Sequence, residues 1–176
     1  MSTNRSDPPA VYRAPMRSRL DGIPVGAAVE RALELGLCGM GGRLPDVPVS
    51  LVDALVRTQE HDGLRTARRL ERFAAAFDGS FVWTRDVDGL LHLGRLHGPW
   101  VYDADPAAIE VDLVHVRACV WASDPIPDAH APPPVLATFA RGGRNWQRIR
   151  AEEASPLSAR VWDDATRAQA VRGHAG

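Results

Sequence analysis

Two groups of arginine residues have the types and spacing of a phosphate-binding surface. Residues 141–150, RGGRNWQRIR, hold four arginines, one tryptophan and no acidic residue. Upstream, four more arginines recur at helical spacing, and we expect them on the outer face of a helix: Arg65, Arg68, Arg69 and Arg72. Guanidinium groups bind phosphates and aromatic rings stack on bases, so this pattern is typical of nucleic-acid binding. The competing interpretation is two solvated surface patches, since the net charge is −1.

Three of the five tryptophans fall within residues 79–121, at positions Trp83, Trp100 and Trp121. Core packing is the ordinary role of a tryptophan, but three in one small sheet also indicate an aromatic wall for a flat base. Along the extended run Val111–Trp121 the even positions from Val114 to Val120 are apolar, and the odd positions include His115 and Arg117. These two sets lie on opposite faces of a strand. We therefore expect the odd-numbered side chains to contact something other than an apolar core.

Metal and nucleophile chemistry receive little support from the sequence. His115 and Cys119 share a face, but four residues of strand separate them by roughly 13 Å, too far for two ligands of one zinc ion. No Gly-x-Ser-x-Gly motif occurs, and apolar neighbours indicate that Cys38 is buried rather than reactive. We expect no metal site and no cofactor. An enzyme acting on a nucleotide or modified base is the alternative, with His97, His115 and Asp86 as its candidate groups.

A glycine-rich turn follows a short extended segment at residues 39–42, GMGG. It lacks the Lys-Ser/Thr pair of a phosphate-binding loop and the spacing of a dinucleotide-binding motif. We interpret it as a structural turn. The alternative is a close approach of the backbone to a ligand at Gly41 and Gly42, with Arg43 beside them.

The composition is that of an ordinary globular protein. Hydrophobic residues make up 45% and charged residues 24% of a 176-residue chain, which favours one domain with a substantial core. The two cysteines do not form a disulfide framework. No apolar run is long enough to span a membrane or to act as a secretory leader. These features favour a cytoplasmic protein without a membrane partner.

Periodicity and turn residues indicate the elements that position these side chains. Helices are expected from Pro24 to Gly36, after Ser50, over Leu64–Phe77 and from Ser155. Strands are expected at Val11–Arg17, Phe81–Arg85, Leu91–His97, Trp100–Tyr102, Val111–Trp121 and Asn145–Arg150, and Leu37–Arg43 is expected to be a short extended piece that runs into the glycine-rich turn. The inward stripes include Val52 and Val56 in the second helix and Phe77 in the third. Residues 1–9 are expected to be disordered, and the five prolines of residues 124–134 to form a rigid extended loop.

Several motifs resemble those of the PUA-like superfamily. The matching segments are DGSFVW at 78–83, LGRLHGPWVY at 93–102, HVRACVW at 115–121, GLCGMGG at 36–42 and NWQRI at 145–149. Within that superfamily the chain is most similar to EVE-like modules, in particular the N-terminal modules of Mrr-type modification-dependent restriction proteins. The family pattern carries an aromatic residue where this chain has Gly42.

The resemblance implies an α+β fold, a small mixed β pseudobarrel with flanking helices, over residues 10–150. Residues 151–176 would form a C-terminal helix docked on the same domain. The implied function is a nucleic-acid reader that recognises a modified or flipped base, in DNA or RNA, in a restriction or defence context. No segment resembling the restriction nuclease domain is present, so the resemblance implies an effector protein as a further partner.

The resemblance and the arginine clusters together give two sets of candidate site residues. The base-binding candidates are Trp83, Trp100, Tyr102, His115, Arg117, Trp121, Gly41, Gly42 and Ser80. The phosphate-binding candidates are Arg43, Arg65, Arg68, Arg69, Arg72, Arg141, Arg144 and Arg148. A protein-interaction module is a further alternative, in which the proline-rich loop and the C-terminal helix contact a partner.

Overall fold

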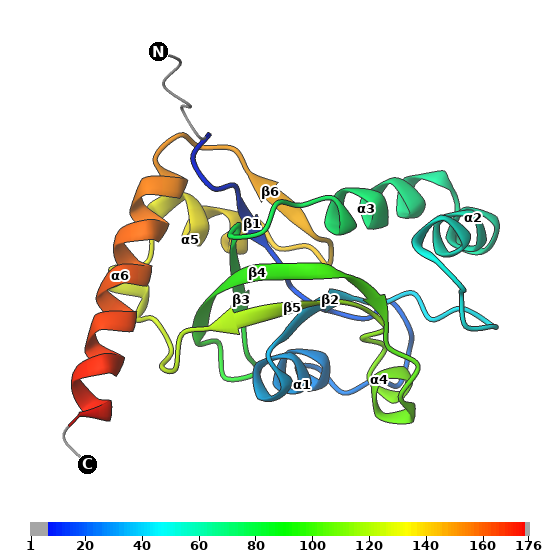
Figure 1. Ribbon diagram of the computed structural model, residues 1–176, viewed down its shortest axis with the longest axis horizontal. Coiled ribbons are helices and arrows are strands. Elements are labelled where there is room, and N and C mark those ends of the chain that lie inside the picture. The colour runs from blue at the N-terminus through cyan, green and yellow to red at the C-terminus, as the bar shows by residue number, and fades with distance from the viewer. Residues whose placement is uncertain (1–6, 175–176) are drawn as a thin grey trace.

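The protein folds as one mixed sheet surrounded by helices, as seen in a computed structural model that describes residues 7–174 (Figure 1). The strands within these residues are β1 (Val11–Arg13), β2 (Leu37–Met40), β3 (Phe81–Arg85), β4 (Leu91–Tyr102), β5 (His115–Trp121) and β6 (Gln147–Ile149). The helices are α1 (Ala27–Leu35), α2 (Leu51–Asp62), α3 (Leu64–Ala74), α4 (Pro106–Glu110), α5 (Pro133–Ala140) and α6 (Ala154–Gly173), with a 3-10 turn at Asp128–His130.

The strand order in the sheet is β2-β5-β4-β3-β1-β6. The pairing of β1 with β3 is parallel, and the other pairs are antiparallel. This confirms the α+β class. In the part of the chain that the structure describes, β2 and β6 are the two outer strands and do not pair with each other, so the sheet is not closed into a barrel.

Strands β3 and β4 form a hairpin, as the Asp-Gly pair between them predicts from the sequence, and its turn is held by one carboxylate. Asp86 accepts hydrogen bonds from the backbone N–H groups of Asp88 and Leu90, at 3.0 and 2.9 Å. Gly89 takes the left-handed conformation that such a turn requires, with φ +83°. The strand then continues past Gly98 to Tyr102, with an irregular register between His97 and Val101.

The strand predicted at Val111–Trp121 and the predicted proline-rich loop differ in extent from what is observed. The strand predicted at Val111–Trp121 begins only at His115, because a short helix, α4, precedes it. Pro106 and Pro133 stand at the starts of α4 and α5, where a missing N–H costs nothing and the fixed φ suits a helix. The proline-rich segment is therefore not extended throughout.

Three apolar side chains predicted to point inward are exposed instead. Val52 and Val56 on α2 are 72% and 51% exposed, because α2 packs chiefly against α3 and leaves its other side to solvent. Phe77 is 84% exposed. Helix α3 ends at Ala74, so helical periodicity no longer sets the direction of Phe77.

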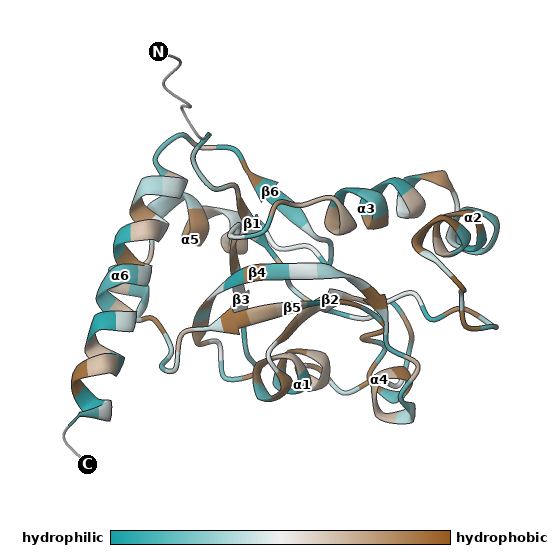
Figure 2. Ribbon diagram, viewed as in Figure 1, coloured by the Kyte–Doolittle hydropathy of each residue, from teal (hydrophilic) through white to brown (hydrophobic). Residues whose placement is uncertain are grey.

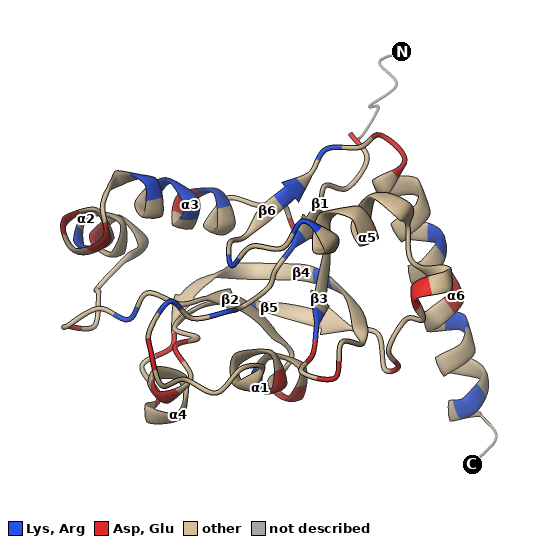
Figure 3. Cartoon of the chain, turned by 180° about the vertical axis from the view of Figure 1, so that it is seen from behind, with Lys and Arg blue, Asp and Glu red and all other residues tan. Residues whose placement is uncertain are grey.

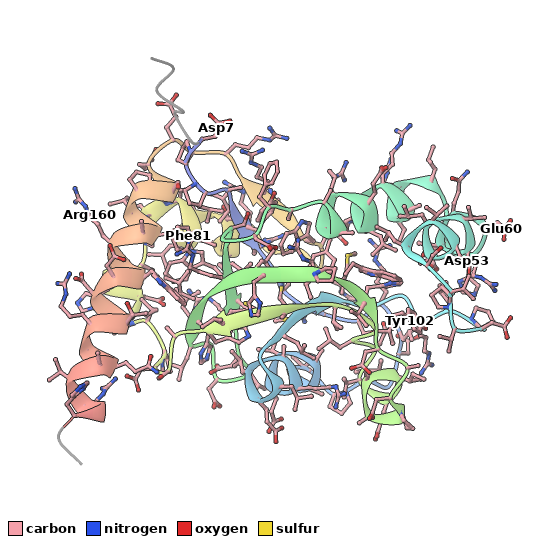
Figure 4. The ribbon with its side chains drawn as sticks, in the orientation of Figure 1. Asp7, Asp53, Glu60, Phe81, Tyr102 and Arg160 are labelled. Atoms are coloured by element: carbon pink, nitrogen blue, oxygen red, sulfur yellow. The ribbon has the colours of Figure 1, made fainter. Side chains whose placement is uncertain are left out.

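Two hydrophobic clusters form the core. The first joins α1, α2 and α3 to β2 and β5, and the second joins α5 and α6 to β1, β3 and β4. Strand β3 contributes to both, because Val82 belongs to the first cluster while Phe81 and Trp83 belong to the second. In Figure 4 the labelled Phe81 lies between the sheet and α6. Much of α3 and β6 is hydrophilic by contrast (Figure 2).

The ends of the described chain lie on the same body. Of the tail predicted to be disordered, residues 1–6 fall outside the described residues, and residues 7–9 have no regular structure. The carbonyl of Pro9 accepts a hydrogen bond from the Ser155 hydroxyl at 2.7 Å, close to the start of α6. No helix within residues 7–174 is long and apolar enough to cross a lipid bilayer.

Candidate functional site

A wide groove lined by arginines runs beside the edge strand β6. Its volume is about 1500 Å³, and residues 7–10, the segment after α3, the start of α5 and β6 with its flanks form its walls. Four arginines line it: Arg72, Arg141, Arg148 and Arg150. We call it the arginine groove. Because β6 pairs only with β1, its outer edge and the exposed Arg148 face the solvent.

A second, small pocket lies next to the groove. Its volume is about 120 Å³, and its lining comes from residues 14–20, the glycine turn at 39–43, the α2–α3 junction and residues 144–146. Trp146 lines both the small pocket and the arginine groove. Its ring is held by Tyr12, stacked at 4.3 Å between centroids, and by Phe73, edge-on at 5.0 Å.

The predicted phosphate-binding arginines are free of ion pairs. Six arginines of residues 7–174 pair with a carboxylate, namely Arg31, Arg57, Arg85, Arg117, Arg167 and Arg172. None of the eight phosphate-binding candidates is among them. Basic side chains gather on α3 and β6, while acidic ones gather on α1, α4 and the β3–β4 turn (Figure 3). The small net charge therefore hides a separation of charge over the surface.

Six of these eight arginines line one of the two cavities. Arg72, Arg141 and Arg148 line the groove, and Arg43, Arg69 and Arg144 line the small pocket. Arg65 and Arg68 line neither of the two and are exposed on α3. The expectation that Arg69 lies on the outer face of its helix is wrong, since it is buried to 8% exposure. It follows the helix face that also buries Leu70 and Phe73.

Burial of Arg69 has an electrostatic consequence. Desolvation lowers the pKa of its guanidinium, and the nearby charges of Arg19, Arg72 and Arg65 lower it further. The small pocket is thus an electropositive site, with Arg17, Arg19, Arg43 and Arg144 exposed around the buried Arg69. Such a site favours a ligand that is anionic or rich in hydrogen-bond acceptors.

Asp112 fixes the glycine turn that forms part of the small pocket. One carboxylate oxygen accepts from the backbone N–H groups of Gly42 and Arg43, at 2.9 and 3.1 Å, and the other accepts from the Ser18 hydroxyl at 2.6 Å. A Cβ on Gly41 would lie 2.3 Å from Oδ2 of Asp112, so only glycine fits there. The turn therefore brings its backbone to the pocket because a buried carboxylate ties it down.

Three predicted base-binding residues form a packed cluster behind this turn. The His115 ring stacks on Trp100 at 5.9 Å and meets Tyr102 edge-on at 5.3 Å. Its Nε2–H donates to the carbonyl of Gly42 at 3.1 Å, while Nδ1 is buried without a partner in the described residues. Burial lowers the pKa of His115 to about 4, so the ring is neutral near pH 7. These rings pack on one another and do not line the small pocket or the groove.

The other predicted base-binding side chains lie in the core. Trp83 is fully buried, and its Nε1–H donates to the Ser158 hydroxyl at 3.0 Å. Trp121 donates to the carbonyl of Leu37 at 2.9 Å. Arg117 is 3% exposed and donates to backbone carbonyls, among them that of Gly98 at 2.9 Å. Ser80 is buried beside the groove. Of the base-binding candidates, Gly41 and Gly42 line the small pocket.

The two faces of β5 also differ from the expectation. The odd positions His115 and Arg117 are more buried than the even ones, since Val120 is 52% exposed. The odd face of β5 is therefore buried in the core. Its polar side chains can be buried there because the carbonyl groups of Gly42 and Gly98 accept their hydrogen bonds.

Several residues that line the two cavities are not among the site residues predicted from the sequence. Trp146 and Asn145 lie in the RGGRNWQRIR segment, in which the sequence indicates a site mainly through the four arginines. Asp62 sits at the end of α2 with no motif around it. Phe77 lines the groove, and the only signal for it was an aromatic residue close behind four arginines.

The groups considered for catalysis are apart from both cavities. His97 is exposed on β4, and the carboxylate of Asp86 is engaged by the hairpin turn and by His92, whose Nε2 lies 2.8 Å from it. Within residues 7–174 no three His, Cys, Asp or Glu side chains come together as a metal site would require.

Comparisons with known proteins give no match, either to a family model or to a curated protein. The functional inference therefore rests on the two cavities and on the side chains that line them.

Proposed function

We propose that the protein is a nucleic-acid-binding reader that holds a strand in the arginine groove and one modified or flipped base in the small pocket. The observation that carries this proposal is that both cavities border Trp146 and that their arginines form no ion pair within residues 7–174. The PUA-like and EVE-like motifs favour the same function, and we propose that fold family for the chain.

The energetics of the groove suit a phosphate backbone. Arg72, Arg141, Arg148 and Arg150 line an open surface and form no ion pair in the described residues, so they can bind phosphates without first breaking a salt bridge. Phe77 is 84% exposed in the same groove, which gives a base a ring to stack on. Stacking of this kind contributes about 1–3 kcal/mol per base.

The small pocket suits a single base. Flipping one base out of a stack costs a few kcal/mol, and this cost is offset by contacts inside the pocket and by phosphate contacts outside it. The arginines around the pocket can hold the phosphates on either side of that nucleotide. The restriction or defence context and the effector partner follow from the family resemblance and belong to the same proposal, as does the cytoplasmic location that the composition favours.

Fluorescence anisotropy with labelled oligonucleotides tests this function. DNA and RNA strands, single and double, are compared in plain, methylated and hydroxymethylated form at two salt concentrations. We expect binding that weakens steeply with added salt and that favours one form of base. A protein that binds none of these strands at low salt would overturn the proposal.

A matched pair of variants locates the binding surface. We expect Arg148→Gln to weaken binding of every strand severalfold, because it removes one phosphate contact regardless of sequence. The control is Arg160→Gln, whose side chain projects from α6 away from the sheet (Figure 4). If both variants bind like the unaltered protein, the strand does not lie in the groove.

A further inference from the structure

One buried charged side chain of the small pocket forms no hydrogen bond or ion pair within residues 7–174. Arg69 lines the pocket and is only 8% exposed. Within residues 7–174 it forms no ion pair, and the charges near it are those of other arginines. No nitrogen of its guanidinium is among the fully enclosed polar atoms without a partner, so its five N–H donors stay accessible, and the group has no acceptor of its own. The side chain therefore points to a ligand that supplies acceptors.

The size of the pocket restricts that ligand to one flat group. Its volume is about 120 Å³. The groove beside it is far larger, at about 1500 Å³. We therefore assign a single base to the pocket and the rest of the strand to the groove. Phosphates then remain outside, where Arg19 and Arg144 are exposed.

The donors of Arg69 select among the bases by their acceptors. A guanidinium fork requires two acceptors side by side, and guanine offers O6 and N7 in that arrangement. Adenine places an amino donor next to N7, and thymine separates its carbonyls by an N–H group. Cytosine offers N3 and O2, so it is the competitor that a second group must exclude.

Asp62 supplies that second group. Its carboxylate lines the same pocket, and the part of the chain described by the structure gives it only the neighbouring His61 ring as a side-chain partner, at 3.2 Å. The two oxygens of a carboxylate match two adjacent donors. Guanine presents N1–H and the 2-amino group, while cytosine presents a single amino group. Guanine therefore satisfies both Arg69 and Asp62.

We propose that the small pocket selects guanine, with Arg69 donating to O6 and N7 and Asp62 accepting from N1–H and the 2-amino group. Selection of one base rests on the proposed function, because the guanine is part of a strand bound in the arginine groove. It adds to that function the identity of the base and the residues that read it.

Single-atom changes in the base test this assignment on the unaltered protein. Oligothymidylates carrying one central guanine are compared with those carrying 7-deazaguanine, inosine, adenine, cytosine or 5-methylcytosine. We expect guanine to bind most tightly and 7-deazaguanine, which lacks N7, to bind about 5-fold to 150-fold more weakly. Inosine lacks the 2-amino group, and we expect its affinity to fall below that of guanine by a smaller factor than for 7-deazaguanine.

A variant assigns the reading to Arg69. Arg69→Lys keeps a positive charge but loses the fork, so we expect the ratio between guanine and 7-deazaguanine to fall towards one. Arg160→Lys is the control and keeps the ratio. Circular dichroism shows whether the Arg69 variant is folded. If the Arg69 variant is not folded, the comparison of guanine with 7-deazaguanine still tests the guanine assignment, because it uses the unaltered protein.

The outcomes separate this inference from the proposed function. Strands that bind equally well with guanine or 7-deazaguanine, or that bind best with 5-methylcytosine, overturn the guanine assignment and leave a nucleic-acid reader. Absence of salt-sensitive binding to every strand overturns the proposed function. Free guanosine monophosphate that binds as tightly as the strand, again with a loss for its 7-deaza form, retains the guanine site and overturns the role of the groove.

Discussion

At the scale of single residues, buried polar groups hold the site in place from behind. His115 and Asp112 both fasten the glycine turn, one through the carbonyl of Gly42 and the other through its N–H. Arg117 fastens the end of α3 to the sheet through carbonyl groups of Phe73, Ala76 and Gly98. These residues act through buried hydrogen bonds. They influence ligand binding by fixing the backbone that lines the pocket.

His115 makes stability depend on pH. Burial lowers its pKa from the ordinary 6.5 to about 4, so between these values the unfolded chain binds a proton that the folded protein does not. Stability from this group is present above pH 6.5 and is lost as the pH falls towards 4, by about 3 kcal/mol in total. We expect His115→Gln to remove that part of the slope in urea unfolding measured across this range.

The exposed His97 provides the control for this experiment, since His97→Gln should leave the slope unchanged. Equal slopes for the unaltered protein and His115→Gln would show that the burial of this ring does not govern the acid sensitivity.

Arg117 is the second residue whose replacement should strongly destabilise the fold. Its guanidinium is 3% exposed, and it satisfies carbonyl groups at the end of α3 that have no helical partner. We expect Arg117→Met to lower the free energy of unfolding by about 3 kcal/mol or more, because several buried acceptors lose their donor. Asp78→Asn, at the exposed end of the same contact, should cost less than about 1 kcal/mol.

At the scale of elements, the sequence predicts local structure well where a turn residue or a cap decides it. Asp86 and Gly89 predict the β3–β4 hairpin, and Ser50 accepts from the N–H of Asp53 at the start of α2 as its spacing predicts. Exposure was predicted less well. Whether Val52, Phe77 or Arg69 is buried depends on which helices pack together, and a single sequence does not contain that information. The lining of the small pocket was the least predictable feature, because it comes from five separate segments of the chain.

Helix α6 shows how an element docks through one polar contact within an apolar interface. Trp162 and Val161 pack against the second core cluster, and the N–H of the buried Trp83 donates to the Ser158 hydroxyl at 3.0 Å. We expect Ser158→Ala to lower the free energy of unfolding by about 1–3 kcal/mol in urea titrations, because the indole N–H is left without an acceptor.

Ser155→Ala is the matched change in the first turn of the same helix. Its hydroxyl bonds to Pro9 at the surface, where water can replace it, so the expected cost is below that of Ser158→Ala. If the two variants were equally stable, the Trp83–Ser158 hydrogen bond would not contribute to docking.

At the scale of the whole molecule, the arrangement of charge matters more than its sum. The net charge is −1, yet every arginine that lines the two cavities is without an ion pair in the described residues, and the paired arginines lie outside both cavities. Acidic side chains on α1, α4 and the hairpin turn balance the total from elsewhere (Figure 3). A strand approaching the groove meets a positive surface, and one approaching the opposite side is repelled.

This arrangement predicts the salt dependence of strand binding. Each phosphate neutralised on a single strand contributes about −0.7 to the slope of log K against log salt, so four groove arginines give a slope of about −3. We expect the double variant Arg141→Gln, Arg148→Gln to bind with a slope shallower by about 1.4. The double variant Arg160→Gln, Arg167→Gln removes the same charge from α6 and should keep the original slope. Equal changes in both double variants would mean that only net charge matters, and that the groove does not hold the strand.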